Sequence, residues 1–128
     1  GSVRIGQKIG IEKFKSFLEN IGVLNKIEFD IEEVGQPIPF RWGKCKLATS
    51  SFGHGITTTP LQLAKGYSII TNGGYDIKPT LIKSSLKKKG NKKIILKAKV
   101  SEKINSILRK VVSTKEGTAG FANVAGLP

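Results

Sequence analysis

The chain has 128 residues, 38% of them hydrophobic, which allows one domain with a modest core and excludes a disordered chain. No apolar run approaches the roughly 18 residues of a membrane span, and no signal peptide is recognised. A single cysteine and a single histidine exclude a disulfide framework and a zinc site of four such ligands. We therefore expect no metal and no cofactor.

The net charge of +13 is the most unusual feature of the composition. Such a charge attracts polyanions, so one interpretation is a small basic module that binds nucleic acid or anionic polymers of the cell envelope. The alternative is a general richness in lysine, since 19 of the 22 basic residues are lysines. Because nucleic-acid readers favour arginine for bidentate contacts, we expect no nucleic-acid partner.

The first predicted element is a helix over residues 11–21, where apolar residues recur at helical spacing and Gly22 provides the C-terminal cap. The next stretch, residues 24–55, alternates briefly at 27–31 before glycine and two prolines interrupt any regular pattern. We predict a long irregular segment there, either functional or packed against another part of the protein.

The second predicted helix follows the threonine run 57–59. Thr59 is a suitable N-cap, Pro60 suits the first helical position, and Gln62 completes a capping box. This helix has little polar surface, so we expect it to be largely buried and to end at Gly73 and Gly74.

Residues 75–83 and 92–97 are predicted as two strands of a hairpin that turns at Gly90 and Asn91. A third helix is predicted over residues 100–114, with Ser101 as its N-cap. The elements together predict an α+β fold with three main helices and a β-hairpin.

His54 lies between two glycines just before the second helix. It could act as a general base or contact a substrate, but only Ser50 and Ser51 offer a local nucleophile. The structural alternative, which we favour, is a loop histidine that bonds backbone groups near the threonine cap. Cys45 and His54 could form a thiol dyad, yet nothing in the sequence brings them together.

Two matches to Ser-x-x-Lys occur, at Ser84–Lys87 and Ser85–Lys88. In that motif the lysine must be desolvated to take the proton of the serine, whereas these lysines lie in a polar connection where water keeps them charged. The stretch 115–120, KEGTAG, imitates Lys-Thr-Gly-Thr but places Glu116 where a hydroxyl should receive a substrate carboxylate. We predict no catalytic residue, no cofactor-binding residue and no metal ligand in the chain.

The stretch 50–74, SSFGHGITTTPLQLAKGYSIITNGG, together with IKPTLIK and ILRKVVSTKEGTAGFANVAG, closely resembles class B penicillin-binding proteins. The likeness is to their transpeptidase domain, and SFGHGI is most similar to the cell-division branch. The resemblance implies a partial serine β-lactamase/D,D-transpeptidase-like fold, in which residues of roughly 30 to 58 correspond to the Ω-loop region of β-lactamases.

Members of this family are serine acyl transferases that cross-link peptidoglycan stem peptides and are acylated by β-lactams. Their chemistry requires Ser-x-x-Lys, Ser-x-Asn and Lys-Thr-Gly, and this chain carries none of the three in a matching position. Its beginning resembles the sequence just after Ser-x-Asn, and its end resembles the approach to Lys-Thr-Gly. We therefore expect residues 1–128 to be the segment of a transpeptidase domain between those motifs, inactive alone. A β-lactam hydrolase is disfavoured by the missing nucleophile.

The resemblance assigns no role to His54 or Cys45, and Glu32 and Glu33 lie too far from any aligned motif to match the deacylating glutamate of class A β-lactamases. For the parent protein it implies stem peptides and β-lactams as partners, and the periplasmic face of the bacterial inner membrane as location, with an N-terminal anchor outside this chain. For the chain alone, exposed apolar faces predict self-association or loose packing.

Overall fold

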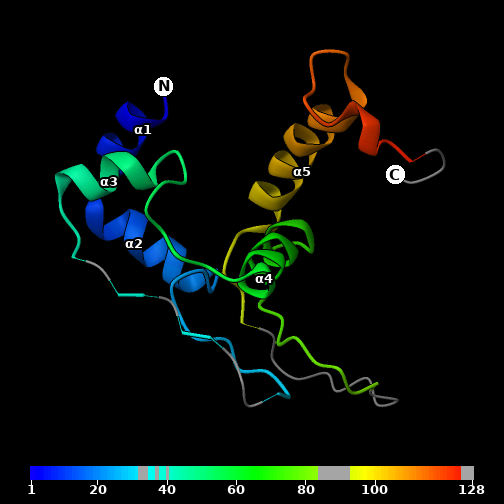
Figure 1. Ribbon diagram of the computed structural model, residues 1–128. Helices are drawn as coiled ribbons and strands as arrows, with labels where there is room; N and C mark the ends of the chain where they lie inside the picture. The colour runs from blue at the N-terminus through cyan, green and yellow to red at the C-terminus, as the bar shows by residue number, and fades with distance from the viewer. Residues whose placement is uncertain (32–34, 37, 40, 84–92, 125–128) are drawn as a thin grey trace.

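The computed structural model describes residues 1–31, 35–36, 38–39, 41–83 and 93–124, which form two groups of helices (Figure 1). In one group α1 and α2 pack together, and both contact α3; in the other, α5 packs on α4 and on the 3₁₀ turn η1. No helix of the first group packs directly on α4 or α5 in the described residues, so a loop after α2 joins the two groups. The bounds are Ser2–Ile9 for α1, Ile11–Asn20 for α2, Lys44–Ser50 for α3, Pro60–Thr71 for α4, Ala98–Ser113 for α5 and Gly120–Ala122 for η1.

The first group is larger than the sequence predicts. Helix α2 confirms the expected first helix, but the prediction that residues 24–55 are irregular is wrong in part, because α3 lies within them. Helix α3 begins after Gly43 without a side-chain cap, so its start carries no local signal. What holds it is close packing on α1: a Cβ added at Gly6 would lie 2.9 Å from the Cβ of Ser51.

A small apolar cluster joins the two groups. Ile21 and Val23, which follow α2, are buried against Ile69 of α4, and Ile69 has no exposed surface. Burial of an aliphatic side chain of this size stabilises a fold by about 1.5–3 kcal/mol. The position of α4 relative to α2 is therefore set by the chain that immediately follows α2.

Helix α4 begins as the sequence predicts. The Thr59 side chain accepts a hydrogen bond from the Gln62 N–H at 3.2 Å, and the Gln62 side chain accepts one from the Thr59 N–H at 2.7 Å. The prediction that this helix is largely buried is wrong, because Leu63 and Tyr67 are half exposed. In the part of the chain that the structure describes, no element covers that side of the helix.

The predicted hairpin reduces, over the described residues, to a single antiparallel bridge between Tyr75 and Ile94. Two backbone hydrogen bonds of 2.8 Å flank it, from Asp76 N–H to the Lys93 carbonyl and from Ile95 N–H to the Gly74 carbonyl. The two bridged segments approach each other so closely that a Cβ at Gly74, whose φ is +92°, would lie 2.1 Å from the Leu96 carbonyl oxygen. Glycine is therefore required at position 74 for two reasons: its φ is positive, and no space is left for a side chain. The expected turn at Gly90 and Asn91 lies outside the described residues.

Helix α5 starts earlier than predicted, and Ser101 is not its N-cap. The cap position is Lys97, while Ser101 lies inside the helix with 1% of its surface exposed. Its hydroxyl donates to the Ile70 carbonyl and accepts from the Gly73 N–H at 3.1 Å. Ser101 therefore satisfies backbone groups at the end of α4, where a helix leaves carbonyl groups without internal partners.

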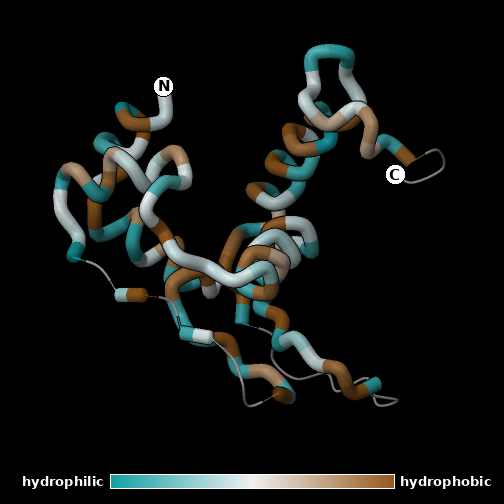
Figure 2. The backbone as a smooth tube through the Cα atoms, in the orientation of Figure 1, coloured by the Kyte–Doolittle hydropathy of each residue, from teal (hydrophilic) through white to brown (hydrophobic). Residues whose placement is uncertain are grey.

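Beyond Ser101 the apolar side of α5 is only partly covered. Figure 2 shows hydrophobic and hydrophilic residues alternating along this helix, as expected for an amphipathic element. Ile107 is 54% exposed and Phe121, in η1, is 94% exposed. The described residues thus leave apolar side chains of α4, α5 and η1 open to solvent.

Candidate functional site

The residues that the sequence singles out for chemistry do not converge. His54 lies in the exposed loop after α3, where its ring stacks on Phe52 with 6.3 Å between ring centroids. Its backbone N–H donates to the carbonyl of Thr49, in the last turn of α3, at 3.1 Å, and not to a group of the threonine cap. Cys45 is an exposed free thiol in α3, and no hydrogen bond joins it to His54.

The remaining candidates give no site either. The Ser-x-x-Lys matches at Ser84–Lys87 and Ser85–Lys88, and the pair Glu32 and Glu33, lie outside the described residues. Glu116 is exposed in the turn that follows α5, where Gly117 N–H donates to the Thr114 carbonyl. Across the part of the chain that the structure describes, no cluster of His, Cys, Asp and Glu could hold a metal ion, and no helix is long and apolar enough to cross a membrane.

Three serines of the described residues donate structural hydrogen bonds to backbone carbonyls. Ser51 donates to the Ala48 carbonyl at 2.7 Å, Ser106 donates to the Lys103 carbonyl at 2.8 Å, and Ser101 joins α5 to α4. The Ser50 hydroxyl is buried and has no hydrogen-bond partner among these residues. The hydrogen bonds that Ser51, Ser101 and Ser106 donate all go to backbone carbonyls, and none goes to a base of the kind that acyl transfer requires.

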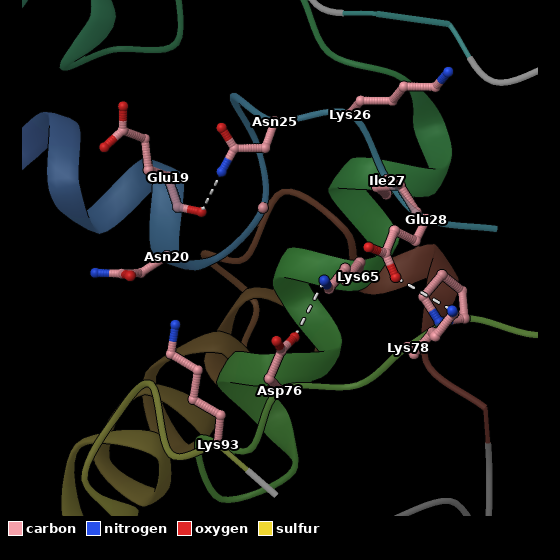
Figure 3. Close-up of a pocket in the computed structure, with 12 residues that line it drawn as sticks. Glu19, Asn20, Asn25, Lys26, Ile27, Glu28, Lys65, Asp76, Lys78 and Lys93 are labelled. Atoms are coloured by element: carbon pink, nitrogen blue, oxygen red, sulfur yellow. Dashed lines mark hydrogen bonds and ion pairs between the residues drawn. The ribbon is translucent and has the colours of Figure 1, made fainter.

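A polar hollow of about 410 Å³ lies between the end of α2, the side of α4 that carries Lys65, and the bridge at Tyr75 (Figure 3). One ion pair, Lys65–Asp76 at 3.2 Å, lies on its floor with side chains that are 19% and 34% exposed. The Oδ1 atom of Asp76 is shielded from solvent, and the Lys65 ammonium offsets the cost of burying that charge. The hollow is lined by Glu19, Asn20, Gly22, Asn25, Lys26, Ile27, Glu28, Lys65, Asp76, Lys78, Pro79 and Lys93.

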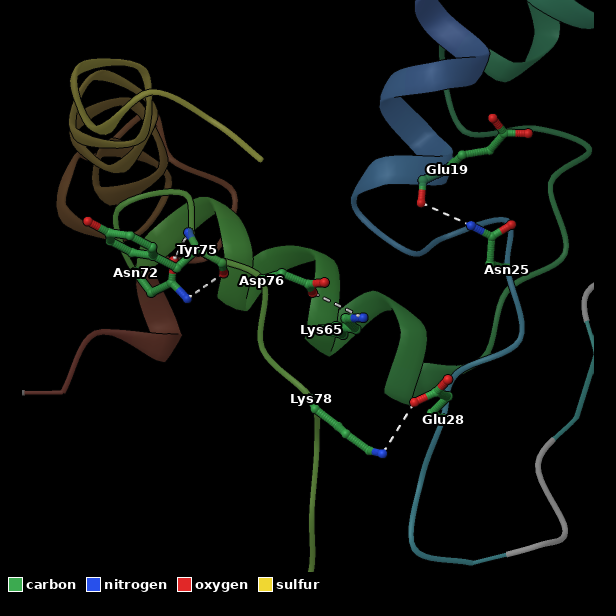
Figure 4. A network of polar contacts seen from close by, with 8 residues as sticks. All are labelled: Glu19, Asn25, Glu28, Lys65, Asn72, Tyr75, Asp76 and Lys78. Carbon is green, nitrogen blue, oxygen red and sulfur yellow. Dashed lines mark hydrogen bonds and ion pairs between the residues drawn. The ribbon is translucent and has the colours of Figure 1, made fainter. Parts of the chain in front are cut away.

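Hydrogen bonds hold the walls of this hollow in place, and Figure 4 draws the one between Asn25 and Glu19. Gln62 of α4, which is 1% exposed, donates through Nε2 to the Asn25 carbonyl at 2.7 Å and to the Val23 carbonyl at 3.4 Å. The Asn25 side chain in turn donates to the Glu19 carbonyl at 3.1 Å, at the end of α2. The loop that forms one wall is therefore fixed to both α2 and α4.

A second contact between distant segments lies beside the hollow. Lys78 pairs with Glu28 at 3.2 Å, and the Asp30 carboxylate accepts hydrogen bonds from the Thr80 hydroxyl at 2.6 Å and the Leu81 N–H at 2.7 Å. The hydrogen bond from Thr80, with the one from Leu81, lowers the pKa of Asp30. Residues 28–30 are thereby tied to residues 78–81 through exposed polar groups.

Comparison with known proteins identifies the class to which this fold belongs. The family model described as "Penicillin binding protein transpeptidase domain" matches residues 1–128. The chain is 27% identical to the "Probable peptidoglycan D,D-transpeptidase FtsI" of Caulobacter vibrioides, covering 99% of this chain and 22% of that protein. It is 31% identical to "Stage V sporulation protein D" of Bacillus subtilis, covering 98% of this chain and 21% of that protein.

Structural comparison agrees with the sequence matches. The transpeptidase domain of penicillin-binding protein 3 from Burkholderia pseudomallei superposes with a TM-score of 0.88 at 22% identity, over 98% of this chain and 39% of that one. The chain belongs to the penicillin-binding protein transpeptidase family, and its fold is a part of the β-lactamase-like transpeptidase fold. It spans about a fifth of the length of the two curated relatives.

Proposed function

We propose that residues 1–128 form a non-acylating segment of a peptidoglycan D,D-transpeptidase, the part between the Ser-x-Asn and Lys-Thr-Gly motifs. The observation that carries the proposal is the absence, within a chain matched by the family over its whole length, of any of the three catalytic motifs in a matching position. In the parent enzyme the segment acts as a scaffold, and it contributes no catalytic, cofactor-binding or metal-binding residue. The stretch SFGHGI favours the cell-division branch, with septal cross-linking of stem peptides as the reaction of the parent.

The hydrogen bonds of the serines support this role. Acylation by a donor peptide or a β-lactam needs a hydroxyl that a neighbouring base deprotonates. Ser51, Ser101 and Ser106 instead donate hydrogen bonds to backbone carbonyls, which are too weakly basic to deprotonate a hydroxyl at neutral pH. Each of these three hydroxyls serves the fold, and none of them donates to a base.

The proposal also gives the parent its location and partners. A cross-linking enzyme of the cell wall meets its substrates on the periplasmic face of the inner membrane, and β-lactams are ligands of the parent. Exposed apolar side chains on α4, α5 and η1 favour self-association of the isolated chain, since soluble monomers rarely leave such surfaces open. Family membership favours this function over a basic module that holds nucleic acid or anionic envelope polymers.

A fluorescent penicillin tests the proposal directly. The 128-residue chain is incubated with the reagent and its intact mass is measured, beside a longer protein that carries the same segment with all three motifs. We expect no mass increase for the chain and a single penicilloyl adduct for the longer protein. An adduct on the isolated chain that survives denaturation would refute the proposal.

A further inference from the structure

The hollow between α2 and α4 carries both signs of charge. Two of its lysines are neutralised by carboxylates, Lys65 by Asp76 and Lys78 by Glu28, each at 3.2 Å. Its charged residues are the four lysines at 26, 65, 78 and 93 and the three acids at 19, 28 and 76. A hollow of this composition offers separate places for a negative and for a positive group.

Lys93 supplies the place for a negative group. Among the described residues its ammonium makes no hydrogen bond and no ion pair, and Figure 3 shows its side chain rising from the bridge toward the side where Asn20 lies. The Lys93 carbonyl accepts a hydrogen bond from Asp76 N–H at 2.8 Å, so the backbone from which the side chain projects is fixed. An exposed ammonium without a partner among these residues, on a stretch of backbone that is held, is suited to a carboxylate, which can accept several hydrogen bonds.

Glu28 supplies the place for a positive group. Its Oε2 atom pairs with Lys78, while its Oε1 atom has no hydrogen bond to any of the described residues. The carboxylate lies on the side of the hollow formed by residues 27, 28 and 78, across from the side where Lys93 and Asn20 lie in Figure 3. The Lys93 ammonium and the Oε1 atom of Glu28, whose Oε2 atom is paired with Lys78, therefore lie on different sides of one space.

We infer that this hollow binds a short peptide with a free carboxylate and a free ammonium group, the carboxylate against Lys93 and the ammonium against Glu28. A volume of about 410 Å³ falls in the range of small-ligand sites, roughly 300–1,000 Å³. A polyanion is a poorer match because the four lysines share this space with three carboxylates, which would repel part of it. This site goes beyond the proposed function, since it concerns binding at a place that carries no acylating group.

The test titrates the isotopically labelled chain with Ala-Ala-Ala and follows backbone amide shifts by NMR. A matched probe is the same tripeptide acetylated at its N-terminus and amidated at its C-terminus, which keeps the shape and removes both charges. We expect saturable shifts at residues 20–28 and 93 with the free peptide. The capped peptide should bind about tenfold more weakly, the product of losing two exposed charge contacts of about threefold each.

Single substitutions test which lysine makes the charge contact with the peptide. Lys93→Gln should weaken binding of the free peptide about three- to fivefold, and Lys93→Arg should restore most of it. The control is Lys99→Gln, an exposed lysine of α5 that does not line the hollow and whose loss changes the net charge equally. Lys99→Gln should leave the affinity unchanged, and superimposable spectra away from the hollow show that each variant is folded.

Several outcomes overturn the inference. Equal binding of the free and capped peptides, or an equal loss for Lys93→Gln and Lys99→Gln, would remove the assigned charge contacts. Absence of saturable shifts up to the solubility of the peptide would remove the site. Tighter binding of inorganic tripolyphosphate than of Ala-Ala-Ala at Lys93 would make it a polyanion site instead. None of these results bears on acylation by penicillin, so the two proposals fail separately.

Discussion

The junction between α2 and α4 and the part of α5 beyond Ser101 are both rich in apolar residues. They differ in how completely the chain buries those residues. At the junction Ile69 has no exposed surface and the buried Gln62 side chain fills its hydrogen bonds with carbonyls of residues 23 and 25. On α5, beyond Ser101, Ile107 remains half exposed. The junction is a self-contained piece of structure, whereas α5 offers a face that this chain does not cover.

The largest expected effect is the loss of the buried side chain at the junction. Ile69→Ala removes it from a fully enclosed position, and we expect a cost of about 2–5 kcal/mol in the free energy of unfolding, because both transfer energy and packing are lost. Urea unfolding followed by circular dichroism measures it.

The matched control is Ile107→Ala on the exposed face of α5, which should stay within about 0.5 kcal/mol of the unsubstituted chain. Equal losses in the free energy of unfolding at the two positions would show that the junction and α5 do not differ in burial.

A smaller loss is expected at Gln62. Gln62→Ala leaves the Asn25 carbonyl and the Thr59 N–H without their side-chain partner in a shielded place, at a cost of about 1–3 kcal/mol. Gln36→Ala, in an exposed segment, is the control and should change little. If the amide resonances of residues 23–25 keep their hydrogen-exchange protection in Gln62→Ala, then Gln62 does not fix the loop.

Ser101 and Ser106 provide a matched pair on one helix. Ser101→Ala removes the hydroxyl that joins α5 to the end of α4 and should cost about 1 kcal/mol. Ser106→Ala removes an exposed hydroxyl that bonds only within α5, and the change should stay within about 0.5 kcal/mol. A thermal melt compares them, and a Ser106 variant as damaging as the Ser101 variant would contradict the assigned contact between helices.

The smallest effect concerns the tie between residues 28–30 and 78–81. The hydrogen bond from Thr80, with the one from Leu81, lowers the pKa of Asp30, so the ionised form stabilises the folded chain above the pKa of an unfolded aspartate, about 3.9. This contribution is lost as the pH falls through the lower pKa of the folded state. Carboxyl chemical shifts of Asp30 against pH measure it, and Thr80→Val should move the pKa back toward its ordinary value. An unchanged midpoint in that variant would show that Thr80 does not hold the carboxylate.

The sequence predicts the elements that depend on interactions between neighbouring residues, and it misses those that depend on contacts between distant residues. The start of α4 is predicted correctly because Thr59, Pro60 and Gln62 act on each other within one helical turn. Helices α1 and α3 are not predicted, since neither has a side-chain cap and each depends on packing against the other. A helix that forms through tertiary contact carries little signal in its own residues.

The polar groups of the candidate site follow the same rule. Glu28 and Lys78 are 50 residues apart, and no spacing in the sequence indicates that they meet. The position of Ser101 before an apolar stripe predicts an N-cap. The helix begins earlier, however, and the Ser101 hydroxyl donates to a carbonyl at the end of α4. In both cases the partner is fixed by the fold, which a pattern along the chain does not contain.

The central claim is that this segment supplies scaffold to an acyl transferase and none of its reacting groups. The most direct test acylates a longer protein that contains residues 1–128 and all three motifs with penicillin, digests it, and locates the adduct by tandem mass spectrometry. The account predicts a penicilloyl group on a peptide outside residues 1–128, with every serine of the segment unmodified. A penicilloyl group on any serine within residues 1–128 would contradict it.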